Sequence, residues 1–228
     1  MPAQHHLPEA LFFDVDGVLI DSMQVKGEAF AQAFDDFPGC REAIIALHLA
    51  NGGVTRSAKI GLIYETILNQ DPQPTDINSR VAAFSRAVVE RVIAAPEIPG
   101  ASEALGRWAQ KSALHAVSAT PTEELLVIFD RRGMTGYFRS VQGWPPKKGD
   151  AVRQILADFG YNPDHCVLIG DSPEDSAAAQ TAGVRFVQVS ASPASDFVHI
   201  NAVIRDLHGL DDAINRVLAE PSSAQPGQ

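Results

Sequence analysis

Two clusters of carboxylates in the sequence each follow a short apolar run typical of a strand buried in a parallel sheet. One cluster is Asp14 and Asp16, in Asp-Val-Asp-Gly, and the other is Asp171 and Asp175, in Gly-Asp-Ser-Pro-Glu-Asp. Because the strands of such a sheet end at one crevice, the four side chains are expected to lie close together. Buried carboxylates repel one another, and a hard divalent cation with oxygen ligands offsets that cost. The pattern therefore predicts a Mg²⁺ site that also serves a phosphate substrate.

Each acidic cluster also has an ordinary structural interpretation. Asp14 and Asp16 would suit a surface turn, in which aspartate and glycine are common. Asp171 or Ser172 would serve simply to cap the helix that follows. Neither interpretation explains why both clusters should stand at strand ends of one sheet, so the shared position favours a functional site.

A serine and a lysine complete the set of residues that could handle phosphate. Ser118 stands at the end of another apolar run, where a hydroxyl and backbone N–H groups can hold phosphate oxygens. Lys147 and Lys148 follow a Gly-Trp-Pro-Pro turn, and one of them can neutralise charge in the crevice. The spacing of Val152 and Leu156 indicates a helix that Lys148 would open. Lys148 is therefore preferred, with Lys147 as the alternative.

The elements that position these residues alternate along the chain. Apolar runs predict strands, and patterns with helical spacing follow them. The predicted strands are residues 11–13, 114–117, 167–169 and 184–189, and the predicted helices between them include 122–132 and 150–159. Strands alternating with helices predict a doubly wound α/β fold with a parallel sheet.

One long stretch after the first strand shows no strand pattern and is expected to be helical. Residues 41–50 and 55–68 are predicted helices, and a third begins at Thr75 or Asp76 as N-cap. The apolar face of that third helix is formed by Ile77, Val81, Phe84, Val88 and Val92. We therefore expect residues 22–95 to form an inserted α-helical cap domain, with residues 1–21 and 96–228 as the α/β core domain.

The composition is that of an ordinary globular protein, with 228 residues, 45% hydrophobic and 20% charged. A net charge of −10 argues against nucleic acid as a partner, because phosphate backbones attract clustered lysine and arginine. No apolar stretch approaches the ~20 residues of a membrane helix, and no signal peptide is recognisable. Cys40 and Cys166 are expected to be buried free thiols. We expect a cytoplasmic protein with no membrane partner; the oligomeric state is not indicated.

The order of the four motifs resembles that of the haloacid dehalogenase superfamily. Asp-x-Asp-Gly, then serine, then lysine, then Gly-Asp-x-x-x-Asp, each follows a predicted strand, and the resemblance spans residues 10–218. The helical insertion resembles the cap of the β-phosphoglucomutase and phosphoglycolate phosphatase branch. This resemblance implies a Rossmann-like core, a helical cap and a phosphoric monoester hydrolase.

The resemblance also implies catalytic roles for the first motif. Asp14 would be the nucleophile that forms an aspartyl-phosphate, which splits one difficult displacement into two easier steps. Asp16 would protonate the leaving group and then deprotonate the water of the second step. An acid at this position points to phosphate esters, because related dehalogenases and phosphonoacetaldehyde hydrolases lack it.

The remaining motifs take metal and phosphate roles by the same resemblance. Mg²⁺ would be held by the carboxylates of Asp14 and Asp171 and by the backbone carbonyl of Asp16. Asp175 would support the metal through water or position Lys148. Ser118 and the lysine would bind the phosphoryl oxygens, where charge is stabilised during transfer.

The insertion contains a glycine-opened loop, Asn-Gly-Gly-Val-Thr-Arg, at residues 51–56. It resembles the Gly-Val-Ser-Arg specificity loop of β-phosphoglucomutase-like caps. Arg56 and Lys59 are predicted to bind the part of the substrate that lies away from the reacting phosphate. A plain helix–helix connection with solvated side chains is the alternative. Together, Arg56 and Lys59 indicate that the substrate carries a second anionic or polar group, as a sugar phosphate or a phosphorylated carboxylate does.

The favoured function is therefore Mg²⁺-dependent hydrolysis of a small phosphorylated metabolite. A phosphomutase is the alternative, since it uses the same aspartyl-phosphate and returns the phosphoryl group to a bound intermediate. A non-catalytic binding protein of this fold is a third possibility, but it would be expected to have lost one of Asp14, Asp16 or Asp171, and all are present.

Overall fold

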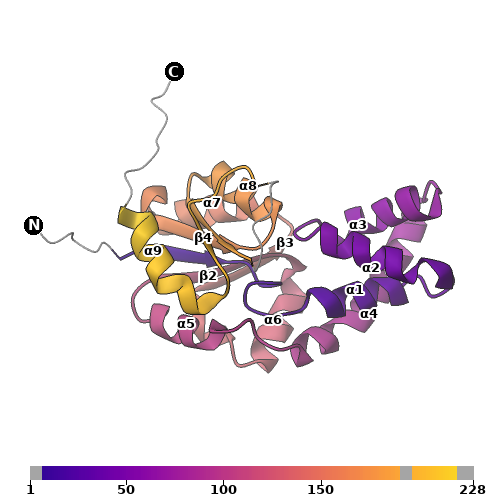
Figure 1. Cartoon of the computed structure of the whole chain (residues 1–228), viewed down its shortest axis with the longest axis horizontal. Coiled ribbons are helices and arrows are strands. Elements are labelled where there is room, and N and C mark those ends of the chain that lie inside the picture. Colours follow the sequence, from indigo (N-terminus) through magenta and orange to yellow (C-terminus); the bar gives the residue numbers. More distant parts are fainter. Residues whose placement is uncertain (1–6, 191–196, 220–228) are drawn as a thin grey trace, which may run out of the picture.

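A six-stranded parallel sheet forms the centre of the structure, a computed structural model that describes residues 7–190 and 197–219 (Figure 1). The strand order is β3-β2-β1-β4-β5-β6, so the chain winds outward from β1 in both directions. The strands are β1 Ala10–Phe13, β2 Ala113–Pro121, β3 Ser140–Trp144, β4 Cys166–Gly170, β5 Arg185–Val189 and β6 Ala202–Ile204. The four apolar runs predicted as strands correspond to β1, β2, β4 and β5.

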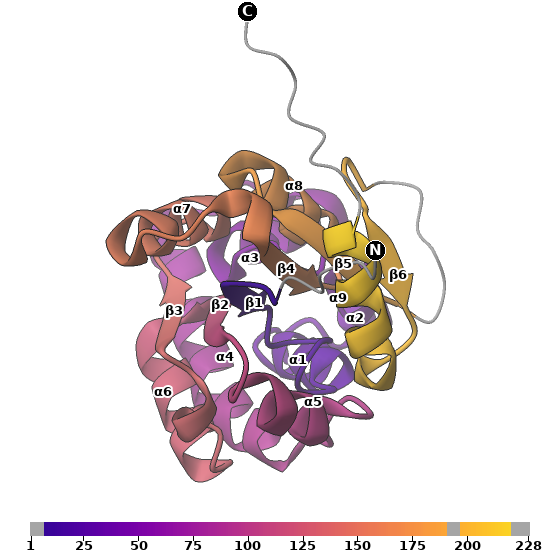
Figure 2. The same ribbon diagram turned by 90° about the vertical axis from the view of Figure 1, so that its left-hand side faces the viewer.

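Helices cover both faces of the sheet, as a doubly wound fold requires (Figure 2). Phe12 of β1 faces α7 and α8, whereas Leu11 and Phe13 face the other layer, because successive side chains of a strand alternate between faces. The flanking helices are α5 Ala101–Trp108, α6 Thr122–Arg131, α7 Lys148–Phe159, α8 Pro173–Ala182 and α9 Leu210–Ala219. The predicted α/β fold class is confirmed.

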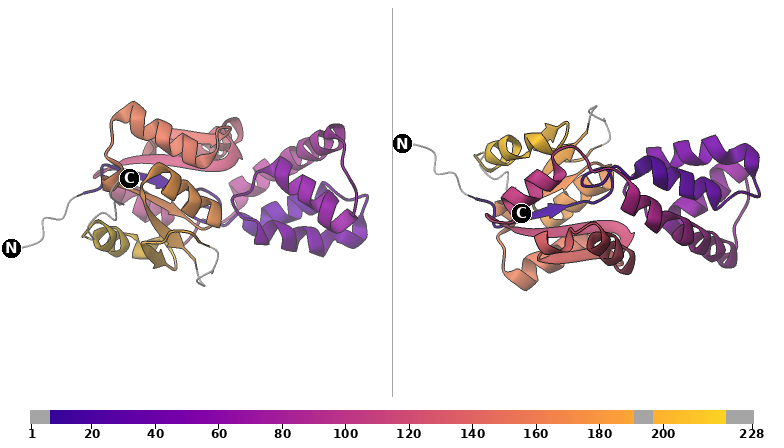
Figure 3. Two further views of the ribbon diagram at one scale, coloured as in Figure 1. Left: turned by 90° about the horizontal axis from the view of Figure 1, so that it is seen from above. Right: turned by 90° about the horizontal axis from the view of Figure 1, so that it is seen from below.

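Four helices between β1 and α5 gather beyond the carboxyl end of the sheet (Figure 3). We call this segment, residues 23–94, the helical insertion. It comprises α1 Met23–Gln32, α2 Arg41–Ala50, α3 Arg56–Leu62 and α4 Pro74–Ala94, with a π-helical turn at Ile63–Leu68. Phe30 of α1 packs against Phe84 of α4, with ring centroids 4.1 Å apart, so the insertion has apolar packing of its own.

The two connections between the helical insertion and the sheet run side by side. The N–H of Asp21 donates to the carbonyl of Pro96 at 2.9 Å, and the N–H of Ile98 donates to the carbonyl of Leu19 at 3.1 Å. These hydrogen bonds lie at the predicted boundaries after residue 21 and before residue 96. A paired connection of this kind holds the two ends of the insertion together as one joint.

Three local predictions differ from the structure. The helix predicted over 55–68 is α3 followed by the π-helical turn, which ends at Asn69 with φ of 52°. The third helix begins at Pro74, after the cap Gln73, because proline suits the first turn of a helix. Both cysteines are free, but only Cys166 is buried; Cys40 is half-buried.

Candidate active site

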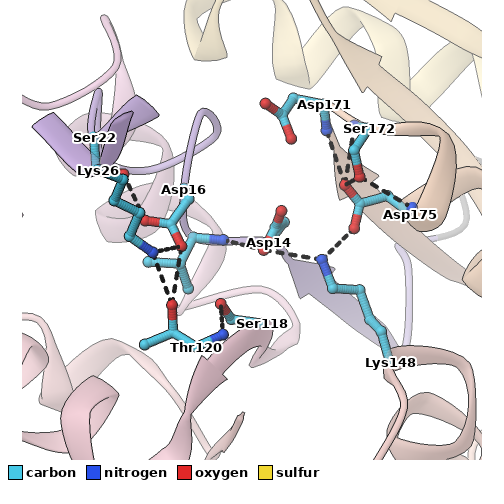
Figure 4. Close-up of polar contacts among 11 residues, drawn as sticks. Asp14, Asp16, Ser22, Lys26, Ser118, Thr120, Lys148, Asp171, Ser172 and Asp175 are labelled. Carbon is cyan, nitrogen blue, oxygen red and sulfur yellow. Dashed lines mark hydrogen bonds and ion pairs between the residues drawn. The ribbon is translucent and has the colours of Figure 1, made fainter. Parts of the chain in front are cut away.

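The first acidic motif begins where β1 ends, and it lies beside the second one (Figure 4). The N–H of Asp14 donates to the carbonyl of Ile169 in β4 at 2.9 Å, which places the two strand ends side by side. Gly17 has φ of +80°, and a Cβ built there would lie 2.1 Å from Oδ2 of Asp171. Only glycine therefore permits this approach of the two acidic loops.

Asp14, Asp171 and Asp175 form a compact cluster whose carboxylate oxygens lie within 4.8 Å of one another. Burial, together with the charge of Asp175, raises the pKa of Asp14 to about 7. Burial and the charge of Asp14 likewise raise the pKa of Asp171 well above its usual value. The fold thus concentrates negative charge in a place with little water, and an opposing charge is needed to stabilise it.

Lys148 supplies part of that opposing charge. Its Nζ lies 3.0 Å from Oδ1 of Asp14, and it also pairs with Asp175. Burial alone would lower the pKa of Lys148, but the two carboxylates raise it above its usual value, so the side chain stays charged. Lys147, the alternative lysine, is exposed. Lys148 is therefore the lysine that the structure brings to the acidic cluster, from the first turn of α7.

The hydrogen bonds of Asp175 show which carboxylates remain to face a cation. Oδ2 of Asp175 accepts from the Ser172 hydroxyl at 2.6 Å and from the N–H groups of Asp171 and Ser172, while Oδ1 is paired with Lys148. The residue thereby closes a capping box at the start of α8. In the described part of the chain no hydrogen bond reaches the Asp171 carboxylate. Asp14 and Asp171 are therefore the ligands available, and such oxygens suit Mg²⁺.

Asp16 lies on the side of Asp14 that faces away from Lys148 and Asp175, and its carboxylate has its own partners (Figure 4). Its carboxylate pairs with Nζ of Lys26 at 2.5 Å and accepts hydrogen bonds from Ser22 at 2.5 Å and Thr120 at 3.2 Å. Burial alone would raise the pKa of Asp16, but the charge and hydrogen bond of Lys26 lower it below its usual value. Asp16 is thus held as a carboxylate facing the helical insertion.

Lys26 was not predicted from the sequence as a site residue. It lies in α1, which was not predicted, and its Nζ also donates to the Thr120 hydroxyl at 2.8 Å. Lys26 therefore links the helical insertion both to Asp16 and to Thr120 of β2. The sequence around it, Gln-Val-Lys-Gly-Glu at residues 24–28, mixes polar and apolar side chains and gives no clear signal of a buried charge.

Ser118 lies at the carboxyl end of β2 and is buried. Its hydroxyl oxygen accepts from the N–H of Thr120 at 3.1 Å, which leaves the hydroxyl hydrogen free to donate to a phosphate. Ser118, Lys148 and Asp14 line the same cavity of about 50 Å³. The structure thus brings the predicted phosphate-binding residues together with the first acidic motif.

Arg56 and Lys59, the two predicted substrate-binding residues of the insertion, line the same cavity from the side of the helical insertion. Arg56 pairs with Glu124 of α6 through two hydrogen bonds of 2.8 and 2.7 Å, and Nζ of Lys59 lies 3.0 Å from Nδ1 of His48. Glu124 was not predicted from the sequence. Gly53 rests on the core, because a Cβ there would lie 2.7 Å from the Ser172 hydroxyl. The insertion is therefore closed onto the acidic loops.

Comparison with known proteins places the chain in a family. A sequence model of haloacid dehalogenase-like hydrolases matches residues 8–183. The phosphoglycolate phosphatase of Rhodospirillum rubrum is 27% identical over 193 residues, covering 81% of this chain and 80% of the relative. Protein CbbY of Rhodobacter capsulatus is 28% identical over 201 residues, covering 78% and 84%. The chain belongs to the haloacid dehalogenase-like hydrolase family.

Solved structures agree on the fold. A haloacid dehalogenase-like hydrolase from Streptococcus pneumoniae superposes with a TM-score of 0.73 at 16% identity, covering 90% of this chain and 97% of that one. Bacillus subtilis YfnB, whose crystals contain magnesium and reveal interdomain movement, gives 0.70 at 17%, covering 92% and 100%. The family model and the curated relatives, rather than these structures, confirm the predicted family and class of enzyme, a phosphoric monoester hydrolase. None of the described helices has the length and apolar character needed to cross a membrane.

Proposed function

We propose that the protein is a Mg²⁺-dependent phosphatase of small phosphorylated metabolites that acts through an aspartyl-phosphate on Asp14. The observation that carries the proposal is the position of Asp14. On one side of Asp14 lie Lys148, which suits a phosphate, and Asp171, which suits a cation. On its other side lies Asp16, which suits proton transfer. Several relatives are named phosphoglycolate phosphatase, so phosphorylated carboxylates are the first substrate class to test.

In the first step Asp14 attacks phosphorus. A bond forms between a carboxylate oxygen and phosphorus, while the bond from phosphorus to the ester oxygen breaks. Ser118 and Lys148 hold the phosphoryl oxygens, where negative charge must be stabilised in the transition state. The leaving oxygen takes a proton from the protonated form of Asp16, which is the minor form in the resting site and stands on the side of Asp14 away from Lys148. The products are a phosphorylated Asp14 and an alcohol.

In the second step the roles of Asp16 reverse. Its carboxylate takes a proton from water, the water oxygen attacks phosphorus, and the bond to Asp14 breaks, which releases phosphate and regenerates the carboxylate. Lys26, Ser22 and Thr120 hold the Asp16 side chain in place for both transfers. Water must therefore reach the phosphorylated intermediate while the organic product leaves.

The same residues fit a magnesium ion. We propose that the carboxylates of Asp14 and Asp171 and the backbone carbonyl of Asp16 hold it, while Asp175 supports the site by positioning Lys148. When bound, the ion neutralises the clustered carboxylates and orients the phosphate for in-line attack.

The helical insertion is proposed to act as a cap. Residues 22–95 would form the cap domain and residues 1–21 and 96–228 the core domain, with the paired connection at Asp21 and Pro96 as the hinge. The cavity below the insertion is about 50 Å³, and it shares Gly53, Ser118 and Lys148 with a larger pocket of about 420 Å³. Opening admits the substrate, and closing excludes bulk water from the first step.

Magnesium is expected to stabilise the protein against heat. Because burial raises the pKa of Asp14 to about 7, the folded state binds a proton more readily than the unfolded state does. The raised pKa of Asp14 therefore adds to the free energy of unfolding at low pH, and this contribution is lost as the pH rises from about 4 toward 7.

At pH 8, where the clustered carboxylates repel one another, saturating Mg²⁺ should raise Tm by about 5 °C or more. Asp171→Asn should shrink that increase, and Asp71→Asn, an exposed control, should not.

Scanning calorimetry or dye-monitored melting across pH, with Mg²⁺ and with a chelator, measures both effects. An unchanged Tm on adding Mg²⁺ to the wild-type protein would contradict the proposed metal site. An equal Tm increase in the wild type and Asp171→Asn would remove Asp171 from it.

Replacing Lys26 by methionine is expected to shift the pH profile. The ion pair with Lys26 lowers the pKa of Asp16. As the pH rises, the protonated form that donates to the leaving group therefore disappears at a lower pH than it would without Lys26. In Lys26→Met the pKa of Asp16 rises, and the fall of kcat/KM with increasing pH should begin at a higher pH. Steady-state kinetics with an alkyl phosphate, whose leaving group needs a proton, would show the shift. A profile that keeps its wild-type shape would separate Lys26 from Asp16.

A substrate panel distinguishes the phosphatase from a phosphomutase. Phosphate should be released from small esters such as 2-phosphoglycolate in the presence of Mg²⁺. Conversion of a bisphosphorylated sugar to its isomer, with no free phosphate from any ester, would overturn the proposed hydrolysis in favour of a mutase.

A further inference from the structure

Four cationic side chains line the cavity, and three of them are already paired with carboxylates. The pairs are Lys148 with Asp14 and Asp175, Lys26 with Asp16, and Arg56 with Glu124. The fourth is Lys59, for which no carboxylate partner is found within the described ranges. The polar atom that Lys59 contacts among the described residues is Nδ1 of His48, at 3.0 Å. The cavity thus contains one cation whose charge is not matched.

Arg56 is committed to Glu124. Both oxygens of Glu124 accept from the guanidinium, at 2.8 and 2.7 Å, and the Ser85 hydroxyl accepts from it as well, at 2.5 Å. The side chains of Arg56 and Glu124 are only 11% and 18% exposed. Removing Arg56 from this pair would leave the Glu124 carboxylate largely buried without its partner, beside an incoming anion. Arg56 therefore fastens α3 of the insertion to α6 of the core.

Lys59 is in the opposite situation. It is 5% exposed and lies above the ring of Phe30. Burial, reinforced by the charge of Lys59, lowers the pKa of His48 to about 3, so the ring is neutral and Nδ1 accepts from the ammonium. The desolvation free energy of a buried ammonium is only partly offset when its hydrogen-bond partner is neutral. An anion that enters the cavity would restore that interaction.

The position of Lys59 indicates which part of a substrate it would contact. In the proposed mechanism the phosphate binds on the side formed by Asp14, Ser118 and Lys148, so the leaving group would point toward Asp16. Lys59 belongs to the helical insertion, and Asp16 is among the charges that act on it. One ammonium matches a singly charged group better than a second phosphate dianion. Asp16 and Lys59 line the same cavity, which favours a short leaving group between them.

We propose that Lys59, oriented by His48, binds a carboxylate on the leaving group, so that the substrates are short phosphorylated carboxylic acids, and that Arg56 holds the insertion closed. This inference rests on the proposed phosphatase activity. It gives the two cations of the insertion separate tasks, recognition for Lys59 and closure for Arg56.

The test compares two esters of equal length, 2-phosphoglycolate and 2-hydroxyethyl phosphate, with Mg²⁺ present. The wild-type enzyme should prefer 2-phosphoglycolate in kcat/KM by about 10- to 100-fold, the range of a buried charged hydrogen bond. In Lys59→Met this preference should collapse, chiefly through a higher KM for 2-phosphoglycolate. Lys111→Met, which removes an exposed lysine beside Trp108, is the matched control and should keep the preference.

Variants of the Arg56 pair separate closure from recognition. Glu124→Gln should lower kcat/KM for both esters by the same factor, so the preference stays. The double variant Arg56→Met/Glu124→Gln, which removes the pair without leaving a buried carboxylate unpartnered, should do the same. A loss of preference in the double variant together with its retention in Lys59→Met would overturn the assignment. If the wild-type enzyme released phosphate from neither ester, the proposed phosphatase would fail; release from both without preference would overturn this inference alone.

The wild-type enzyme provides a second readout that needs no variant. Burial and the charge of Lys26 lower the pKa of Lys59 to about 8. The preference for 2-phosphoglycolate should therefore decline as pH rises above about 8, while KM for 2-hydroxyethyl phosphate does not follow the same curve. The titratable and charged groups that act on Lys59 are His48, Lys26, Asp16, Asp171 and Glu174. A preference constant from pH 7 to 10 would contradict the role of Lys59.

Discussion

Asp14→Asn is expected to abolish turnover, lowering kcat by about 10⁴-fold or more while the fold stays intact. Asparagine has nearly the same shape but cannot form the acyl-phosphate bond, so the two-step route closes entirely. Lys148 and Asp171 would still bind the phosphate and the cation. Phosphate release from 2-phosphoglycolate under saturating Mg²⁺ measures the effect, with Asp71→Asn as the exposed control.

Stability of the same variant tests whether the loss is chemical or structural. Ionised Asp14 is disfavoured by burial and by Asp175, which raise its pKa to about 7. Above that pH, and without metal, the neutral amide removes this repulsion, so Tm of Asp14→Asn should be equal to or higher than that of the wild type. Activity near the wild-type level would overturn the nucleophile assignment, and a large fall in Tm would make the loss of turnover structural.

Asp16→Asn is expected to lower kcat by about 10²- to 10⁴-fold for an alkyl phosphate, the range of general acid–base catalysis. The amide keeps an oxygen for the Ser22 and Thr120 hydroxyls but can neither donate a carboxylic proton nor accept one from water. An aryl phosphate has a leaving group that needs no proton. Its first step should therefore be much less affected than its second.

Rapid-mixing kinetics separates these two steps. Asp16→Asn should release about one equivalent of the aryl alcohol per enzyme in a burst, followed by slow phosphate release, because the intermediate on Asp14 awaits an activated water. A uniform loss for both esters with no burst would mean that Asp16 only positions other groups.

Much of the core could be predicted because its strands are buried on both faces. β1 and β4 are continuous apolar runs in the middle of the sheet, and the acidic motifs follow them directly. The two strands that were missed, β3 and β6, are the edges of the sheet. Edge strands are less buried: β3 contains serine, glutamine and glycine, and β6 has three residues, so neither shows a clear apolar run.

The candidate site was predicted less completely in the helical insertion than in the core. Each core motif is a short run of residues at the end of a strand, such as Asp171 and Asp175 after β4, so it can be recognised locally. The pairs of Lys26 with Asp16 and of Arg56 with Glu124 join helices of the insertion to the core, across 10 and 68 residues of sequence. The buried face of α1 contains Lys26 and Gly27, which obscure its helical periodicity.

The most direct test of the proposed phosphatase activity is phosphate release from 2-phosphoglycolate by the wild-type enzyme and by Asp14→Asn. Both are measured with Mg²⁺ and with a chelator. We predict Mg²⁺-dependent release by the wild type that the chelator stops and that the variant lacks. Release that is unaffected by the chelator, or that persists in Asp14→Asn, would contradict a magnesium-dependent phosphatase acting through Asp14.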